Sequence, residues 1–138
     1  MMNELKFRAW WAEAEEYVKV SGIDFTNEEI HYIEEYRNKT YSIDEIPFNE
    51  IIIEQYTGLK DKNGKEIYVG DIIDINQTVN GYNLFVITFE NGLINVRYAH
   101  DMSQYEYDIL ELLDWDQLSL IETENEVVGN IHENKELL

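Results

Sequence analysis

The fold is decided by one stretch of sequence, Asn83-Leu84-Phe85-Val86-Ile87-Thr88-Phe89-Glu90-Asn91-Gly92-Leu93-Ile94-Asn95-Val96-Arg97-Tyr98. Successive side chains of a strand fall on opposite faces, which places Leu84, Val86 and Thr88 on one face and Phe85, Ile87 and Phe89 on the other. The pair Asn91-Gly92 tolerates the positive φ values of a tight hairpin turn. The stretch therefore predicts two paired antiparallel strands, 83–90 and 93–98.

Short strands are expected on both sides of this hairpin, because six of the seven glycines lie beyond residue 54, between runs of Ile, Val, Tyr and Phe. Upstream, a polar turn at 60–65 precedes a strand that begins at Gly70-Asp71 and carries Ile73 and Ile75 on the side opposite Ile72. Downstream, residues 126–131 predict a short closing strand.

One helix is expected in the same half of the chain. The segment Ser103-Gln104-Tyr105-Glu106 has the spacing of a capping box. Apolar residues follow at helical spacing, namely Tyr105, Ile109, Leu112 and Leu113. These features predict a helix over about 103–113. Together with the expected strands, this helix gives the predicted fold class: mainly β, a β-rich α+β chain with one short helix.

The first 54 residues also indicate strands. Alternation over residues 5–10 predicts a strand, and residues 17–20 before Ser21-Gly22 suit its hairpin partner. Residues 26–29 could cap a helix, but tyrosine and β-branched residues at 30–33 and 41–43 favour pleated surfaces, so strands are preferred there. Pro47 marks a break. We expect an N-terminal β-containing region at 1–54 and a second region at 55–138.

The composition indicates a folded chain without sulfur chemistry. The chain has 138 residues, 44% of them hydrophobic, and no cysteine. Such a length forms one domain or two small ones and buries roughly two thirds of the unfolded surface. The absence of cysteine excludes disulfides, thiolate nucleophiles and the usual structural zinc sites. Stability must come from packing.

The charge limits the classes of partner. The formal net charge is −19, and after residue 100 eleven acidic residues accompany a single lysine. Nucleic acids and anionic lipids are bound through clustered Lys and Arg, so both are disfavoured as partners. The simplest interpretation of this acidic charge is a solvated surface that keeps the protein soluble. The alternative is a surface that binds a basic partner or imitates DNA. The N-terminus lacks the layout of a secretory signal and no apolar stretch reaches ~20 residues, so we expect a cytoplasmic protein.

The three histidines and a calcium-like turn give little support for a metal site. His31, His100 and His132 lack the spacing of paired ligands, and isolated histidines are usually surface residues. The segment Asp61–Glu66 resembles a calcium loop only superficially, because the alternating carboxylate before glycine and the distant bidentate Glu are missing. A turn explains it better.

Catalytic motifs are also lacking. The pairs Asp71/Asp74 and Asp114/Asp116 suit acid–base chemistry only in a cleft that shifts one pKa, and such pairs arise by chance in a chain with 29 acidic residues. Phosphate-binding glycine loops and a nucleophile elbow are absent. We therefore expect no enzyme, and assign no catalytic residue, metal ligand or cofactor.

Two local basic clusters remain. One interleaves Lys6 and Arg8 with Phe7, Trp10 and Trp11, and the other consists of Lys60, Lys62 and Lys65 around the turn. Aromatic residues beside cations can bind single-stranded nucleic acid by stacking over a basic groove. The preferred interpretation is a strand with buried aromatic residues and a solvated lysine turn.

Three segments together resemble a known family. They are Leu5-Lys6-Phe7-Arg8-Ala9-Trp10, the block from Gln55 to Ile72 (QYTGLKDKNGKEIYVGDI) and the close from Val127 to Asn134 (VVGNIHEN). In this order they resemble the YopX family of phage and prophage proteins, whereas residues 12–50 match nothing recognisable. Trp11 stands where many relatives have an acid. The resemblance implies a small Src-homology-3-like antiparallel barrel in the C-terminal half, and no catalytic residues.

Two functions from different classes follow as hypotheses. The first is a non-enzymatic protein-interaction module in the bacterial cytoplasm, binding a protein partner or a second copy; abundant Tyr and Trp suit contact surfaces. The second is a nucleic-acid-directed protein, either a DNA mimic that opposes a host DNA-binding protein or a weak nucleic-acid binder. Small barrels host many tasks, so fold alone does not choose between them.

Overall fold

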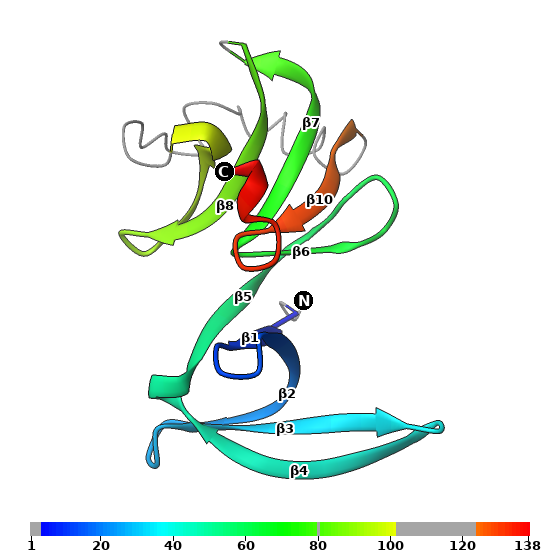
Figure 1. Cartoon of the computed structure of the whole chain (residues 1–138), viewed down its shortest axis with the longest axis vertical. Coiled ribbons are helices and arrows are strands. Elements are labelled where there is room, and N and C mark those ends of the chain that lie inside the picture. Colours follow the sequence, from blue (N-terminus) through cyan, green and yellow to red (C-terminus); the bar gives the residue numbers. More distant parts are fainter. Residues whose placement is uncertain (1–3, 80, 102–123) are drawn as a thin grey trace. The chain divides into compact units, whose positions relative to one another are not determined.

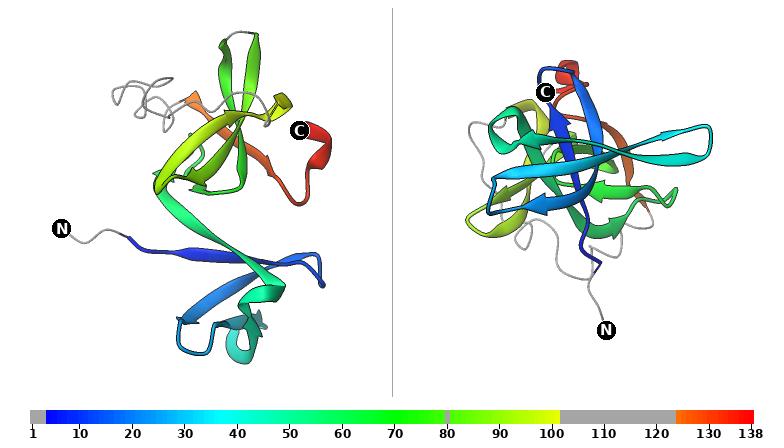
Figure 2. Two further views of the ribbon diagram at one scale, coloured as in Figure 1. Left: turned by 90° about the vertical axis from the view of Figure 1, so that its left-hand side faces the viewer. Right: turned by 90° about the horizontal axis from the view of Figure 1, so that it is seen from below.

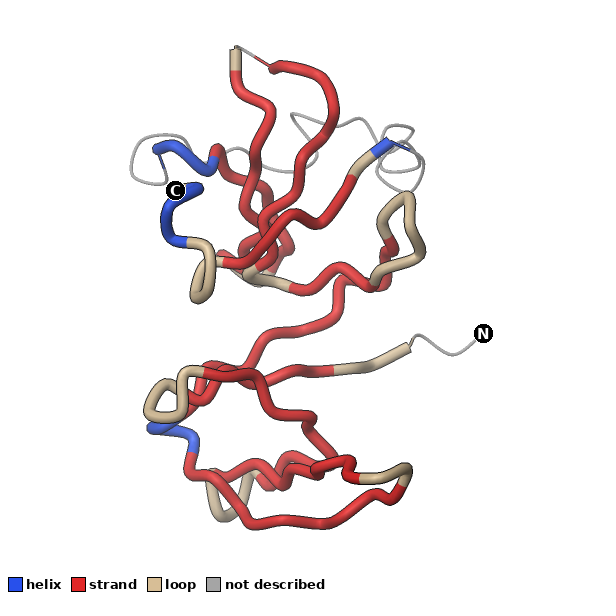
Figure 3. The backbone as a smooth tube through the Cα atoms, turned by 45° about the vertical axis from the view of Figure 1, so that its right-hand side comes forward, coloured by secondary structure: helices blue, strands red, loops and turns tan. Residues whose placement is uncertain are grey.

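A computed structural model describes residues 4–79, 81–101 and 124–138 and shows two compact units (Figure 1). The N-terminal unit is Lys6–Gln55, and the described residues of the C-terminal unit are 4–5, 56–79, 81–101 and 124–138. In the described ranges, regular structure is strand apart from short 3-10 turns and one helical residue, Glu124 (Figure 3). The chain is therefore mainly β, and none of its described helical turns is long and apolar enough to span a membrane.

The N-terminal unit is an antiparallel sheet with strand order β4-β3-β2-β1-β5. Its strands are β1 (Phe7–Trp11), β2 (Glu16–Asp24), β3 (Glu29–Tyr36), β4 (Lys39–Pro47) and the first half of β5 (Ile51–Lys60). A 3-10 turn, η1 (Phe48–Glu50), connects β4 to β5. The strand expected near residue 7 and its hairpin partner are confirmed, since Ala9 lies opposite Val18.

The preference for strands over a helix at residues 30–43 is also confirmed. β3 and β4 form a hairpin that closes at Arg37-Asn38, two residues with φ values of 51° and 59°. This hairpin, cyan in the figures, extends beyond the other strands of its unit (Figures 1 and 2). The inner face of the sheet holds one apolar core, formed by Ala9, Val18, Ile30, Tyr32, Ile46 and Ile51.

The C-terminal unit contains an antiparallel sheet with strand order β10-β7-β8-β9. Its strands are β7 (Asp71–Val79), β8 (Tyr82–Glu90), β9 (Leu93–Tyr98) and β10 (Glu126–Asn130). The second half of β5 pairs with β6 (Glu66–Tyr68), and two 3-10 turns complete the unit, η2 (Ala99–Asp101) and η3 (Lys135–Leu137).

The central hairpin is confirmed. Glu90 lies opposite Leu93, and Asn91 and Gly92 have φ values of 52° and 77°, as the turn requires. The predicted faces are confirmed as well, because Phe85 and Ile87 share a core with Ile73 and Ile75. On the opposite face, Ile72 and Val86 pack with Ala99. The expected closing strand corresponds to β10, which pairs with β7.

Two expectations for this half have different outcomes. The Src-homology-3-like barrel is not confirmed, because the ladders recorded among the described residues leave the sheet open between β10 and β9. β6 has three residues and pairs with β5 at only two recorded positions. It therefore contributes few backbone hydrogen bonds to the sheet. The helix expected at 103–113 lies outside the described residues.

We expect Gly92→Val to lower the free energy of unfolding by about 1–2 kcal/mol, the cost of a left-handed backbone for a residue with a Cβ. Apart from Gly92 itself and its two chain neighbours, no atom lies within 4 Å of the position that a Cβ would occupy, so the loss comes from φ rather than from a clash. Urea denaturation measures it. Gly92→Asn is the control and should lose less, because asparagine tolerates this region; equal stability of the Val variant would contradict the turn.

Candidate functional site

A groove opens in the N-terminal unit where β2 and β3 separate. Their ladder ends at the pair Lys19 and Ile33. From there toward residue 16, β2 pairs only with β1, and toward residue 36, β3 pairs only with β4, in the recorded ladders. The space between the diverging strands has a volume of about 410 Å³.

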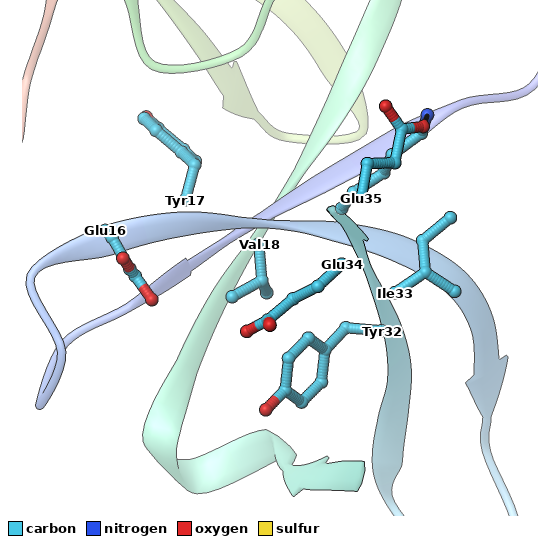
Figure 4. A pocket seen from close by; sticks show the side chains of 8 residues that line it. Glu16, Tyr17, Val18, Tyr32, Ile33, Glu34 and Glu35 are labelled. Atoms are coloured by element: carbon cyan, nitrogen blue, oxygen red, sulfur yellow. Dashed lines mark hydrogen bonds and ion pairs between the residues drawn. The ribbon is translucent and has the colours of Figure 1, made fainter. Parts of the chain in front are cut away.

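Four side chains converge in this groove. Figure 4 shows Glu16 and Val18 from β2 and Tyr32 and Glu34 from β3 pointing into the same space, whereas Ile33 and Glu35 point away from it. The reason is the two-residue period of a strand, which sends neighbouring side chains to opposite faces. The groove therefore continues the core face of the sheet and turns acidic where β2 and β3 diverge.

Tyr32 forms the inner part of the groove and lacks a polar partner. Its exposed fraction is 8%, and its ring lies 6.1 Å from that of Trp11. Across residues 4–79, 81–101 and 124–138 the structure records no hydrogen bond to the Tyr32 hydroxyl, and the buried Trp11 Nε1 has no partner either. Buried polar groups are normally hydrogen-bonded, so Trp11 Nε1, which does not line the groove, is unusual. The Tyr32 hydroxyl faces the groove and can bond to a ligand there.

The groove is electrostatically negative. No ion pair is recorded for Glu16 or Glu34 within the described part of the chain. Lys19 also lines the groove, but its Nζ lies 2.9 Å from Glu35 Oε1, so Glu16 and Glu34 leave the lining with a net negative charge. Burial, followed by the charges of Glu34, Asp44 and Glu16, raises the pKa of Tyr32. The phenol therefore stays protonated at neutral pH and offers one donor and two lone pairs between carboxylates. Such a set suits a cationic group.

Sequence reasoning missed this groove. It singled out neither Glu16 nor Glu34, and it noted Tyr32 only as a strand residue. One signal was present: the alternate positions Ile30, Tyr32 and Glu34 run from apolar to acidic along one face of β3. That signal does not show that β2 leaves β3 at this point, which is a property of the tertiary fold.

The first basic cluster is engaged within the protein. Arg8 Nε donates to Glu54 Oε1 at 3.0 Å, and the guanidinium lies 4.3 Å from the centre of the Tyr17 ring. In the second cluster, Lys62 Nζ lies 3.5 Å from Glu126 Oε2. At least two of the five cations proposed as nucleic-acid contacts, Arg8 and Lys62, are thus already paired with carboxylates.

The calcium-like segment is a turn closed by Asp61, as predicted. The Oδ1 atom of Asp61 accepts hydrogen bonds from the backbone amides of Asn63 and Lys65, each at 2.9 Å. The Oδ2 atom accepts one from the amide of Val127 at 3.0 Å. Both carboxylate oxygens are therefore used as acceptors for the main chain.

We expect calorimetric titration with calcium to show no heat from a saturable site at this turn, because binding would displace three backbone donors from Asp61. Comparison with Asp61→Asn identifies any contribution of this carboxylate. A saturable signal that the substitution removes would contradict the structural interpretation.

His31 is the histidine that gathers acidic neighbours. One ligand atom from each of Asp24, Glu29 and His31 lies within 4.8 Å of the others. Asp24, however, already closes the turn between β2 and β3, since Oδ1 accepts the amides of Thr26 and Asn27 at 2.9 and 3.0 Å. The hydrogen bond from the Asn27 amide is the main cause that lowers the pKa of Asp24. Asp24 therefore has a structural role in this turn.

The remaining described candidates have other local contacts. His100 lies in η2, 6.3 Å from the ring of Tyr82, and His132 donates its backbone amide to Asn130. Asp71 is buried and accepts the amide of Tyr68, while Asp74 accepts the amide of Asn76. The pair Asp114/Asp116 lies outside the described residues.

The fold and the groove define a class of protein: an antiparallel β protein of two units with an acidic groove in its first sheet. The chain belongs to the YopX family, whose model, described as YopX protein, matches residues 6–138. It is also similar to a solved structure, the crystal structure of protein EF1440 from Enterococcus faecalis, with 28% identity, a TM-score of 0.62 and coverage of 99% of each chain. A search of curated proteins found no match.

Proposed function

We propose that the chain is a non-enzymatic protein-interaction module of a phage or prophage, acting in the bacterial cytoplasm, whose groove binds a basic segment of a protein partner. The observation that carries this proposal is the convergence of Glu16, Glu34 and the unpartnered Tyr32 hydroxyl in one groove. A lysine or arginine side chain would supply the missing positive charge and hydrogen-bond donors. The family match fits this proposal and assigns no chemistry.

The net charge supports a basic partner rather than a second copy. Two chains of charge −19 repel each other, whereas a basic segment is attracted and steered toward the groove. Binding should therefore weaken as salt rises, because added ions screen charges over ~8 Å at physiological strength.

The nucleic-acid alternative is less well supported. Arg8 and Lys62 are paired with carboxylates, and phosphate binding gains in proportion to the cations engaged. In a gel-shift series at about 0.15 M salt, we expect no binding of single- or double-stranded DNA. Submicromolar binding that fades with salt and is lost when the 60–65 turn is neutralised would favour the nucleic-acid alternative instead.

Fluorescence anisotropy with short arginine-containing peptides tests the proposal directly. Replacing Glu16 and Glu34 by glutamine should raise Kd about ten-fold, which corresponds to ~1.4 kcal/mol. The matched control replaces the exposed Glu13 and Glu133, which lie outside the groove and change the net charge equally. An equal loss in both double variants would show attraction by net charge alone and would overturn the groove as the binding site.

A further inference from the structure

We infer that the groove holds its basic partner as an added β-strand, paired antiparallel with the open edge of β3 at Glu35 and carrying its cations at alternate positions. This inference rests on the proposed function and specifies how the partner binds. It joins two features of the same place: an unoccupied strand edge and an acidic face beside it.

The open edge follows from the register of the β3–β4 hairpin. Tyr36 and Lys39 flank the two-residue turn and lie opposite each other, so their backbone groups face one another. Hydrogen-bonding direction alternates along a strand, and the N–H and C=O of Glu35 therefore point away from β4, to the side that β2 has left. The recorded β2–β3 ladder stops at Ile33, two residues earlier.

An open edge of this kind is a template for another strand. Main-chain hydrogen bonds supply affinity, and side-chain pockets at every second position supply specificity. The side chains of residues 34–36 in the hairpin are exposed. The exposed fractions of Tyr36 and Tyr41 are 60% and 45%. A strand added at Glu35 would lie against these residues.

The side-chain pattern of the partner follows from the two faces. On the groove face, an added strand meets Glu16, Glu34 and the Tyr32 hydroxyl. On the opposite face it meets Glu35, whose charge Lys19 already neutralises. Arginine or lysine is therefore favoured at every second position, with small polar residues between, while adjacent cations would place half of their charge on the neutralised face.

Peptides of identical composition separate this binding mode from simple charge attraction. One peptide of about seven residues, a usual strand length, alternates arginine with threonine; a second carries its arginines in one block. We expect the alternating peptide to bind about ten-fold more tightly. Methylating its backbone nitrogens at the positions that face β3 should remove this advantage, because a methylated amide cannot donate to the Glu35 carbonyl.

A variant of the protein tests the edge itself. Glu35→Pro removes the donor at the open edge, a position where proline is tolerated in sheets, and should abolish the preference for the alternating peptide. Glu35→Gln is the control for the side chain and should retain the preference. If the proline variant fails to fold, the methylated peptide tests the same edge: an unchanged advantage over the block peptide after methylation would contradict strand addition.

The failures of the two proposals are distinguishable. If both peptides bind equally and both lose affinity in the Glu16→Gln/Glu34→Gln variant, strand addition is wrong and the basic-partner proposal stands. If neither peptide binds, the proposed function itself is wrong.

Discussion

Asp61→Ala is expected to lower the free energy of unfolding by about 3 kcal/mol, because three backbone donors lose a charged acceptor. Asp61 is 4% exposed and accepts the amides of Asn63, Lys65 and Val127 at 2.9, 2.9 and 3.0 Å. Alanine leaves these amides without their partner at a site that water reaches poorly. Urea denaturation near neutral pH measures the loss.

The same carboxyl group makes stability depend on pH. Burial tends to raise the pKa of Asp61, but the amides of Val127, Lys65 and Asn63 together outweigh it, so its pKa is lowered. A carboxyl group with a lowered folded-state pKa stabilises the protein above its unfolded pKa, and this stabilisation is lost as pH falls through the folded pKa. The difference between wild type and Asp61→Ala should therefore shrink below the ordinary pKa of 3.8.

Asp61→Asn is the control for this prediction. Asparagine keeps one oxygen acceptor but carries no charge, so its loss relative to wild type should be smaller than that of alanine. The stability of the Asn variant itself has no contribution from titration of residue 61, so its difference from wild type should also shrink at acidic pH. A constant difference between wild type and Asp61→Ala from neutral to acidic pH would contradict the assigned role of the charge.

Glu54→Ala should destabilise the N-terminal unit by about 3 kcal/mol, within the range for removing one partner of a buried ion pair. Glu54 is 2% exposed, and its Oε1 accepts Arg8 Nε at 3.0 Å and the Tyr17 hydroxyl at 2.8 Å. Without Glu54, the Arg8 side chain, which is 18% exposed, loses this carboxylate partner in a poorly solvated place.

Two variants sharpen this test. Glu54→Gln keeps an acceptor and should lose less, and Glu35→Ala removes the exposed partner of Lys19 and should change the midpoint of urea denaturation little. If Glu54→Ala and Glu35→Ala lower the free energy of unfolding equally, burial of the Arg8–Glu54 ion pair does not increase its contribution to stability. A larger loss in Glu54→Ala than in Glu35→Ala is the expected result if Arg8 is a structural cation rather than a contact for phosphate.

The sequence predicted what neighbouring residues control. Alternation over 83–90 and the Asn91-Gly92 turn fix a hairpin locally, because strand faces repeat every two residues and a positive φ selects few residue types. The strands at 30–43 were harder to predict, since Thr26-Asn27-Glu28-Glu29 also suited a helix cap. Pairing with β2 on one side and β4 on the other decided in favour of strands.

The candidate site, by contrast, was not predictable from local pattern. Glu16 and Glu34 are ordinary charged residues in a chain with 29 acidic ones, and neither sequence neighbourhood marks them. They converge because β2 leaves β3 after the pair Lys19 and Ile33, so that each strand continues with a different partner. Where two strands part depends on the packing of the whole sheet.

The sequence by itself determined the β class, the central hairpin, the calcium-like turn and the acidic charge, since each follows from composition or from residues a few positions apart. Tertiary structure alone decided the open sheet, the groove and the roles of the buried acids. Asp61 bonds an amide 66 residues away, and Arg8 bonds a carboxylate 46 residues away. Such contacts are selected by burial and hydrogen-bond satisfaction across the folded chain, and no local pattern encodes them.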